Sequence, residues 1–437
     1  MTRLRIRVSA WTLALLPAIV PAVSRADEPP PLDLAALLEQ AEGSNPEILV
    51  ARARLQASEH VSTQLEALPD PEATVAYTND SLTAFTLGDS PDSELTLGWK
   101  QEVPYPGKRG LAGDVARGDI AVLASTLDAA RWRVRAGVKS LYAELLRVGR
   151  TTAILGESRK LLLAYQESAR ARYESGDGIL ENILRAQTEV AKLDAELAIL
   201  AQERRSLEVR LLGLLGQSAD APVGPALAAP RVEAPDRAAI EAIALARSPE
   251  IRTLQSAAVR GGLRVDLARR SLKPDFIWSA AYTNRGDLDP MVMGMFGLRL
   301  PVYRKQKQAE AVVQAEFDLE AARLEVEASE VVVLAEIRDL LAQAGRAEVL
   351  LRLYGESILP QARSTLDAAA ASYGAGRTEF ITLIDDFLMV LTYEINVETQ
   401  RAERVKALAA AEPLVGTDLV LPGTDDALNT AQGGSDG

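Results

Sequence analysis

The fold is decided by the segment that opens with VPYPGKR, residues 103–109. Two prolines and a glycine end one element there, and the chain then runs to Gly176 without another proline. This predicts one helix from about Lys108 to Ser175, roughly 100 Å long at a rise of 1.5 Å per residue. Its apolar residues follow heptad spacing, at Leu127, Val134, Val138, Leu141, Leu145, Val148, Leu155 and Leu162. Such a seam needs partner helices along its whole length.

The same landmarks occur twice in the chain, about 200 residues apart. A helix start at Ser44-Asn45-Pro46-Glu47-Ile48 returns as Ser248-Pro249-Glu250-Ile251, and both place a proline and an acid early in the helix. Ala-Tyr-Thr-Asn at 76 and 281, a proline at 104 and 301, and a Tyr-x-x-Gly turn at 173 and 373 follow in order. We therefore expect two repeats, 27–216 and 236–416, with long hairpins at about 108–215 and 305–412, joined by a proline-rich linker at 217–235.

Both ends of the chain are expected to lie outside these repeats. Residues 1–26 combine early arginines, an apolar run and a small-x-small motif, which is typical of a secretory signal peptide. A transmembrane anchor is the alternative, although the run is short and contains prolines. Because the chain has no cysteine, we expect neither a lipoprotein anchor nor disulfides. The tail, 417–437, is predicted to be disordered.

Composition argues against two classes of function. Without the expected signal, 44 basic residues face 61 acidic ones, and phosphate binding needs a basic surface, so no nucleic-acid partner is expected. The acidic balance indicates a solvated surface or a conduit that favours cations. With one histidine, His60, no cysteine and no phosphate-binding loop, the sequence predicts no enzyme and no catalytic, cofactor or metal site.

Four segments change from a helical period to a period of two, at about 72–79, 94–103, 275–284 and 291–300. The fourth is less clean, because three methionines oppose its apolar face. Each has the length of a tilted membrane strand, although an amphipathic hairpin over a soluble core is the alternative. Aromatic side chains suited to the membrane interfaces lie on the apolar faces, at Tyr77, Trp99, Trp278, Tyr282 and Phe296.

Four strands cannot close a membrane barrel by themselves. Closure takes about eight strands or more, and open edges in lipid leave backbone groups unpaired at several kcal/mol each. The sequence therefore predicts a mainly α chain of long antiparallel coiled-coil helices whose strands contribute to a membrane barrel shared between protomers. Three copies would give a 12-stranded barrel.

Residues from about 32 to 416 resemble the TolC family of outer-membrane efflux and secretion channels. The resemblance rests on Asn45-Pro46-Glu47-Ile48, on residues 104–109, on the two Tyr-x-x-Gly turns and on Leu184-Arg185-Ala186-Gln187. It implies a homotrimer with its barrel in outer-membrane lipid and a periplasmic tunnel of helices. It also implies docking to a periplasmic adaptor and an inner-membrane RND or ABC transporter, for which the trimer is a passive exit duct in tripartite efflux or type I secretion.

The resemblance places the hairpin tips at 173–180 and 373–380. The residues that would dock on the adaptor are Gly176, Asp177, Gly178, Gly376, Arg377 and Thr378. Glycine accepts the left-handed backbone of such turns, although helix termination alone also accounts for Gly176 and Gly376.

The resemblance further implies a gate held by polar contacts, with rings of acids. By spacing, the acidic positions fall on Asp385, Thr382 and Asn182, and a basic position falls on Thr378 beside Arg377. The constriction candidates are therefore Asp385, Thr382, Asn182, Tyr373 and Arg377. Asp385 either faces the pore, where three carboxylates would favour cations, or lies on a solvated helix face; Asp386 is expected on the solvated face.

One other function stays open, a soluble periplasmic adaptor with a helical hairpin. Such a protein needs one hairpin and small β domains, whereas this chain has two hairpins and aromatic strand faces. The cargo also stays open among metals, drugs and secreted proteins. Residues 105–109 resemble branches of the family associated with heavy-metal resistance.

Overall fold

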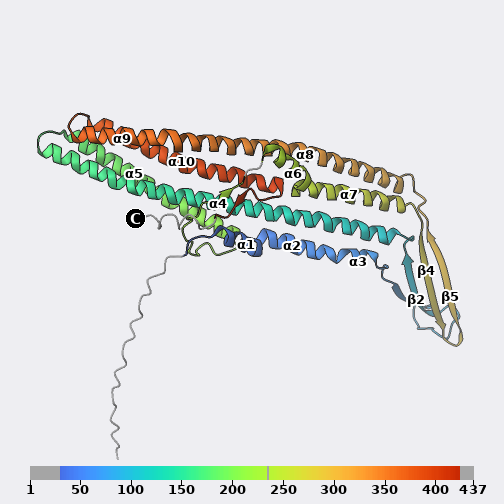
Figure 1. The fold of residues 1–437 in the computed structure, drawn as a ribbon. Helices are drawn as coiled ribbons and strands as arrows, with labels where there is room; N and C mark the ends of the chain where they lie inside the picture. Colours follow the sequence, from blue (N-terminus) through green and yellow to red (C-terminus); the bar gives the residue numbers. More distant parts are fainter. Residues whose placement is uncertain (1–29, 234–235, 424–437) are drawn as a thin grey trace, which may run out of the picture.

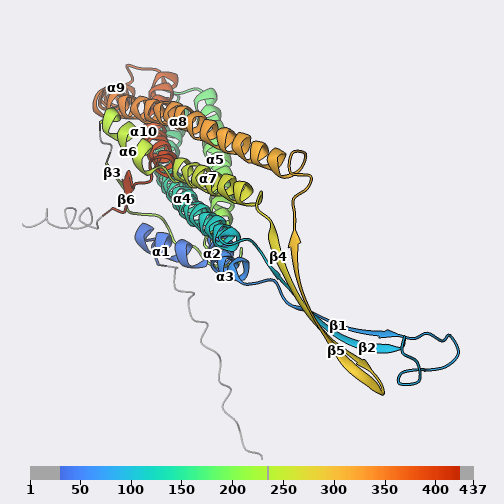
Figure 2. The same ribbon diagram turned by 90° about the vertical axis from the view of Figure 1, so that its right-hand side faces the viewer.

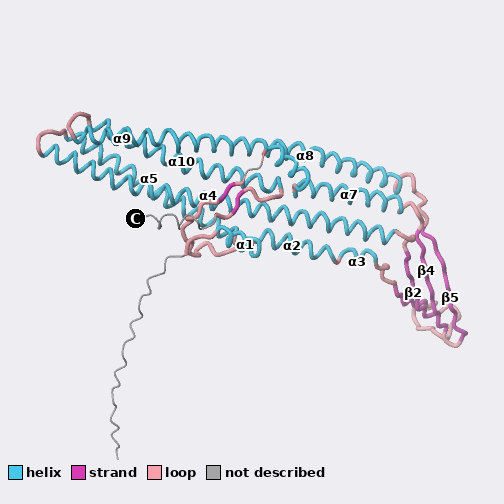
Figure 3. Tube along the Cα trace, viewed as in Figure 1, coloured by secondary structure: helices cyan, strands magenta, loops and turns pink. Residues whose placement is uncertain are grey.

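The structure is a computed structural model that describes residues 30–233 and 236–423. Helices run along the length of an elongated bundle, with the strands at one end and the turns between paired helices at the other (Figure 1 and Figure 3). The expected signal peptide lies outside the described residues. In the two described ranges, no helix is long and apolar enough to cross a membrane.

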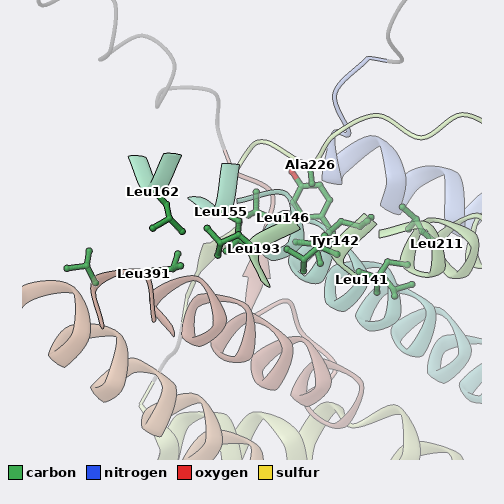
Figure 4. Close-up of a cluster of buried hydrophobic side chains, with 14 of the residues drawn as sticks. Leu141, Tyr142, Leu146, Leu155, Leu162, Leu193, Leu211, Ala226 and Leu391 are labelled. Atoms are coloured by element: carbon green, nitrogen blue, oxygen red, sulfur yellow. The ribbon is translucent and has the colours of Figure 1, made fainter. Parts of the chain in front are cut away.

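The long helix predicted from the heptad seam is present as α4 (Lys108–Glu174), with 67 residues. All eight residues of the predicted seam are buried. They lie in one hydrophobic cluster with side chains of α1 (Leu34–Ser44), α2 (Pro46–Glu59), α5 (Leu180–Leu214) and α10 (Phe380–Val415). Figure 4 shows Leu155 and Leu162 in this cluster with Leu193 and Leu391. The helix is thus the centre of the bundle, as its apolar spacing predicts.

Shorter helices lie end to end beside α4 (Figure 1). α2 and α3 (Val61–Glu66) cover its sheet-side half and α5 its other half, while α1 packs near the middle. Where α5 meets α2, the Asn45 side-chain amide donates to the Leu214 carbonyl at 2.8 Å and its oxygen caps Glu47 and Ile48. The predicted helix start is therefore confirmed, and it also forms the joint between two helices.

Glycine is required at this joint. Gly216 has φ +64°, and a Cβ there would lie 2.4 Å from the Ser44 carbonyl oxygen. The second half repeats the arrangement where α10 meets α7 (Pro249–Arg270), since Gly416 has φ +71° and a Cβ would lie 2.6 Å from the Arg247 carbonyl oxygen. Both close approaches exclude a side chain.

The second long helix is not continuous. It consists of α8 (Gln308–Arg352), the π-helix η1 (Leu353–Ile358) and α9 (Leu359–Gly374), of 45, 6 and 16 residues, so its length equals that of α4. Pro360 is the second residue after the π-helix. Proline lacks an N–H and its ring clashes with the preceding turn of a regular helix, which a wider turn relieves. The apolar spacing of this segment does not predict the interruption.

The four predicted strands form one antiparallel sheet in the order β1-β2-β4-β5. Its members are β1 (Glu72–Thr78), β2 (Glu94–Val103), β4 (Asp275–Arg285) and β5 (Leu288–Arg299). β5 begins three residues earlier than expected, because a tight turn at Gly286, with φ +66°, joins it to β4. Figure 2 shows the sheet as a twisted ribbon that leaves the helical bundle.

The VPYPGKR stretch joins the sheet to the bundle. Gly107, with φ +87°, is the N-cap of α4. The next residue, Lys108, pairs with the Asp275 carboxylate at 2.7 Å, and the backbone N–H of Tyr105 donates to the same carboxylate at 2.8 Å. This carboxylate at the start of β4 therefore fixes the start of α4.

The expected linker and the start of the expected tail meet near the middle of the bundle. Arg231–Val232 (β3) pairs with Val420–Leu421 (β6), and Leu419 and Val420 are fully buried. The prediction of disorder is wrong for residues 417–423, and the remainder, 424–437, lies outside the described residues. The polar composition of this segment was misleading, because Asp418 pairs with Lys139 and Arg135 of α4.

Helix α6 (Arg237–Arg247) opens the second repeat and packs against α8 and α10. Its Glu241 accepts hydrogen bonds from Arg338 and Arg237 at 2.8–2.9 Å. These two hydrogen-bonded guanidinium groups lower the pKa of Glu241 to about 2. An ion pair between Glu241 and Arg338 thus links the first helix of the second repeat to α8.

Candidate functional site

The two hairpin tips are built in the same way. α4 ends at Glu174 and α9 at Gly374, and the following glycines, Gly176 and Gly376, have φ +86° and +74°. In each tip the glycine N–H donates to a tyrosine carbonyl, and the next N–H donates to the carbonyl one residue before that tyrosine. This pair of bonds ends a helix with a left-handed residue, which explains why glycine stands at both positions.

Arg172, in the last turn of α4, ties the first tip to the second. Its guanidinium donates to the carbonyls of Tyr373 and Gly374, the latter at 2.9 Å, and lies 4.5 Å from the centre of the Tyr373 ring. Tyr373 is buried between this guanidinium and Phe380, whose ring centre is 5.4 Å away. Burial raises the pKa of the Tyr373 phenol against the opposing charge of Arg172.

The tyrosines of the two tips therefore differ in their surroundings. Tyr173, which matches Tyr373 in the duplication, is exposed. The hydroxyl of Tyr373 is buried without a hydrogen-bond partner in the described part of the chain. The two tips therefore differ in packing, because Arg172 of the first hairpin covers the tyrosine of the second hairpin and, among the described residues, none covers Tyr173 in the same way.

A second link joins the returning helices α5 and α10. Arg185 donates to the Asp385 carboxylate at 2.9 Å, and the two side chains are 35% and 58% exposed. They occupy matching positions of the two repeats, so the duplication itself places a cation opposite an anion. Because the pair is open to water, it is weaker than a buried ion pair and depends on salt.

The predicted constriction residues are not all brought together. Asp385 lies in the link to Arg185, and Tyr373 lies under Arg172. Thr382 is exposed and Asn182 half-buried, and within residues 30–233 and 236–423 neither side chain makes a hydrogen bond to the other hairpin. Asp386 is half-buried, more covered than Asp385, contrary to the expectation that it is the solvated member of the pair.

Near the tips, the basic side chains that cross between the hairpins are Arg172 and Arg185, not the expected Arg377. Arg377 is exposed, and in the described ranges it makes no ion pair. The remaining predicted docking residues lie at the tips, where Gly176, Asp177 and Gly376 are exposed and Gly178 and Thr378 half-buried. Gly178 also needs to be glycine, since a Cβ would lie 2.9 Å from the backbone nitrogen of Tyr173.

At the opposite end, the sheet carries a continuous apolar face. The register pairs Leu97 with Tyr282, Trp99 with Ala280, and Trp278 with Phe296, so the predicted aromatic residues share one side of the sheet. All five are exposed, from 39% for Tyr77 to 52% for Trp278 and Phe296. The strands at the two edges, β1 and β5, have no partner on their outer sides in the described structure.

A buried ion cluster holds the middle of the bundle. Lys139 of α4 is fully buried and donates to both carboxylate oxygens of Glu412, at 2.7 and 2.8 Å, and to Asp418. Glu412 also accepts the backbone N–H groups of Leu419 and Val420. Burial acts to raise the pKa of Asp418, but hydrogen bonds from Lys139 and Arg135 outweigh it and hold that pKa below its ordinary value.

No profile of a known protein family matches the sequence, and no curated protein matches it. Several solved structures share its fold. The outer membrane protein VceC of Vibrio cholerae matches with a TM-score of 0.74 and 19% identity, over 88% of this chain and 96% of VceC. The open state of the MtrE outer membrane channel of Neisseria gonorrhoeae matches with a TM-score of 0.73 and 15% identity, over 89% of each chain.

The CmeC outer membrane channel of Campylobacter jejuni matches with a TM-score of 0.72 and 12% identity, over 91% of this chain and 88% of CmeC. The protein therefore has the fold of outer-membrane channels. The predicted architecture, with long helices, a duplicated plan and a small antiparallel sheet, is confirmed.

Proposed function

We propose that this chain is one protomer of a trimeric outer-membrane channel, a member of the TolC family that serves as a passive exit duct for an inner-membrane transporter. The observation that carries the proposal is the sheet, which exposes an aromatic face and two open edges at the end of the bundle remote from the tips. Unpaired edges are costly in lipid, so the sheet needs neighbours. Three copies that pair β5 of one with β1 of the next would close it.

The helical tips form the other end of the proposed duct. There Gly176, Asp177 and Arg377 stand exposed at the turns and are the proposed contacts of a periplasmic adaptor. An RND or ABC transporter in the inner membrane would supply the energy, in efflux or in type I secretion. The fold shared with VceC, CmeC and MtrE supports this arrangement.

The proposed closed state is held within each protomer by Arg172 and Arg185. Opening the duct requires the second hairpin, α9 with α10, to move away from the first, which breaks the bonds to the Gly374 carbonyl and to Asp385. The two links differ in strength, because the guanidinium of Arg172 covers a buried ring whereas the Arg185 pair is open to water.

Fractionation of an expressing Gram-negative cell tests the proposed function directly. The expected result is a trimer in the outer-membrane fraction, measured as the mass of the detergent-solubilised particle. Leu97→Lys places a charge on the aromatic face, where a membrane strand loses about 2–4 kcal/mol, and should abolish assembly. Thr96→Lys, on the other face of the same strand, is the matched control and should assemble normally. A soluble periplasmic monomer would overturn the channel and favour the adaptor.

Conductance in planar bilayers tests the gate. Arg172→Ala should raise the open fraction of the reconstituted channel more than Arg185→Ala. A double-mutant cycle on the open fraction should give a coupling energy of about 0.2–1 kcal/mol between Arg185 and Asp385, and this coupling should be lost at high salt. Arg377→Ala is the control and should leave conductance unchanged. Equal effects of all three arginine variants would argue against the proposed links.

A further inference from the structure

Three of the five methionines in the chain lie within one strand, β5. Met291, Met293 and Met295 occupy alternate positions, so their side chains share one face of the sheet. Their partners on β4 are small, namely Thr283, Ala281 and Ser279. Small neighbours leave the thioethers uncovered, and the three residues are 48%, 53% and 56% exposed.

These methionines do not belong to the aromatic face. Phe296, Trp278 and Tyr282 lie on the opposite side of the sheet. The methionine face is mostly polar and small, with Ile277 as a further large apolar side chain, and it includes Thr96, Gly98, Lys100, Glu102, Ser279, Ala281, Thr283 and Arg299. Lipid contact or core packing therefore does not account for three long apolar side chains at these positions.

Thioether sulfur is a soft ligand that selects monovalent copper among biological metals. The chain offers few competing ligands, because it has no cysteine and one histidine. Within the described ranges, no group of three His, Cys, Asp or Glu side chains could hold a metal ion. Residues two apart on a strand are separated by about 6.8 Å, and flexible methionine side chains can bring two sulfurs from that distance onto one ion.

The charges around the strand decide which methionines are available. The Arg285 guanidinium lies 3.6 Å from the Met291 sulfur, which opposes a cation there. Arg299 is ion-paired with Glu102, and Lys100 with Glu72, so their charges are compensated. Met293 and Met295 are therefore the pair best placed to hold a cation, with Met291 at the side.

We propose that Met293 and Met295 form a weak binding site for a soft monovalent cation, Cu(I) or Ag(I). Both ligands lie on β5 itself. That they face the conduit rests on the proposed function, in which the aromatic face meets lipid and the opposite face lines the bore. A site on a conduction path must bind weakly enough to release the ion, and two neutral thioethers without a thiolate suit that requirement.

The test uses Ag(I), which needs no reductant, and the purified full-length protein in detergent. Equilibrium dialysis gives the silver bound per chain, and X-ray absorption identifies sulfur neighbours. Wild type should bind silver through sulfur. Because loss of even an outer-shell partner weakens metal sites about 10–100-fold, Met293→Leu/Met295→Leu should weaken binding at least about tenfold. Leucine conserves volume, so the fold should persist.

Met389 supplies the matched control, since it is 47% exposed but stands alone on α10. Met389→Leu should bind silver as wild type does, and Met291→Leu should lose less than the double variant. Equal binding by wild type and Met293→Leu/Met295→Leu would overturn the site. Potassium conductance in planar bilayers separates the two proposals: conduction without sulfur-bound silver overturns the site alone, and sulfur-bound silver without conduction overturns the channel alone.

Discussion

α4 and the segment formed by α8, η1 and α9 have equal length and matching positions in the two repeats, yet they differ in continuity and in the helices packed around them. α4 is an unbroken helix surrounded by α5, α7, α10 and the first three helices. Its counterpart is interrupted by η1 and packs mainly on α7 and α10, leaving Phe317 and Val331 about 70% exposed. Duplication of a sequence therefore does not duplicate its surroundings. One copy forms the core of the bundle, and the other leaves large apolar side chains exposed.

The largest effect on stability is expected from substitution of the most buried charged residue of α4. Lys139 on α4 is fully buried, whereas the matching residue of the second half, Asp339, is exposed. Lys139→Met leaves Glu412 buried without its cation and should lower the free energy of unfolding by about 3–5 kcal/mol. Asp339→Ala should change it by less than about 0.5 kcal/mol. Denaturant titration measures both, and similar values would contradict the asymmetry.

The next effect concerns the two helix joints. Asn45 caps α2 and bonds the end of α5, whereas Ser248, at the matching joint, makes no side-chain hydrogen bond to its helix and its buried hydroxyl lacks a partner in the described structure. Asn45→Ala should cost about 0.5–2 kcal/mol of stability. Ser248→Ala should be neutral or stabilising, because it removes a buried unsatisfied hydroxyl. A loss at Ser248 equal to that at Asn45 would refute this reading of the joints.

A smaller effect is expected at the interruption. Pro360 matches Lys160 of α4, so Pro360→Lys makes the second helix resemble the first. Proline costs about 3 kcal/mol inside a regular helix, and the π-helix already relieves part of that cost. Amide hydrogen exchange of 353–358 should therefore slow, towards the rate of 153–158 in α4. Unchanged exchange would mean that packing, for instance of Tyr354 on Tyr393, sets the π-helix.

The smallest effect is a pH dependence found in one half only. Glu241 and Arg338 form an ion pair where the first half has the buried residues Leu38 and Val138. Because the pKa of Glu241 is lowered from 4.5 to about 2, its stabilisation is fully present above about pH 4.5 and is lost as the pH falls towards 2. Wild type should therefore lose more Tm on acidification than Glu241→Gln. Parallel Tm curves for the two proteins would exclude this contribution.

Much of the fold could be predicted because its signals are periodic and local. Three patterns each predict a structure from residues close in the sequence. They are the heptad seam of α4, the alternation in β2 and the paired glycines at 176 and 376. The duplication then located the second half. The interruption at η1 escaped because Pro360 alone does not say whether a helix ends, kinks or widens.

The links between the tips could not be predicted in the same way. Arg172 and Arg185 meet partners about 200 residues away, and nothing near them in sequence names those partners. Alignment of the two repeats held a usable signal, since it sets Arg185 opposite Asp385. The ribbon of β3 and β6 was missed for a related reason, because two-residue strands show no alternation to detect.

The joint between α5 and α2 has a mechanical consequence. α4 alone is covalently continuous from the sheet to the first tip, while the helices beside it only abut at Asn45 and Gly216. A force applied at the tip is therefore transmitted to the sheet through the covalent chain of α4. At the joint between α5 and α2 the same force acts on hydrogen bonds, which are weaker. In each repeat, therefore, one long helical segment connects the sheet to the tip, and the two helices beside it meet at a joint that contains a glycine.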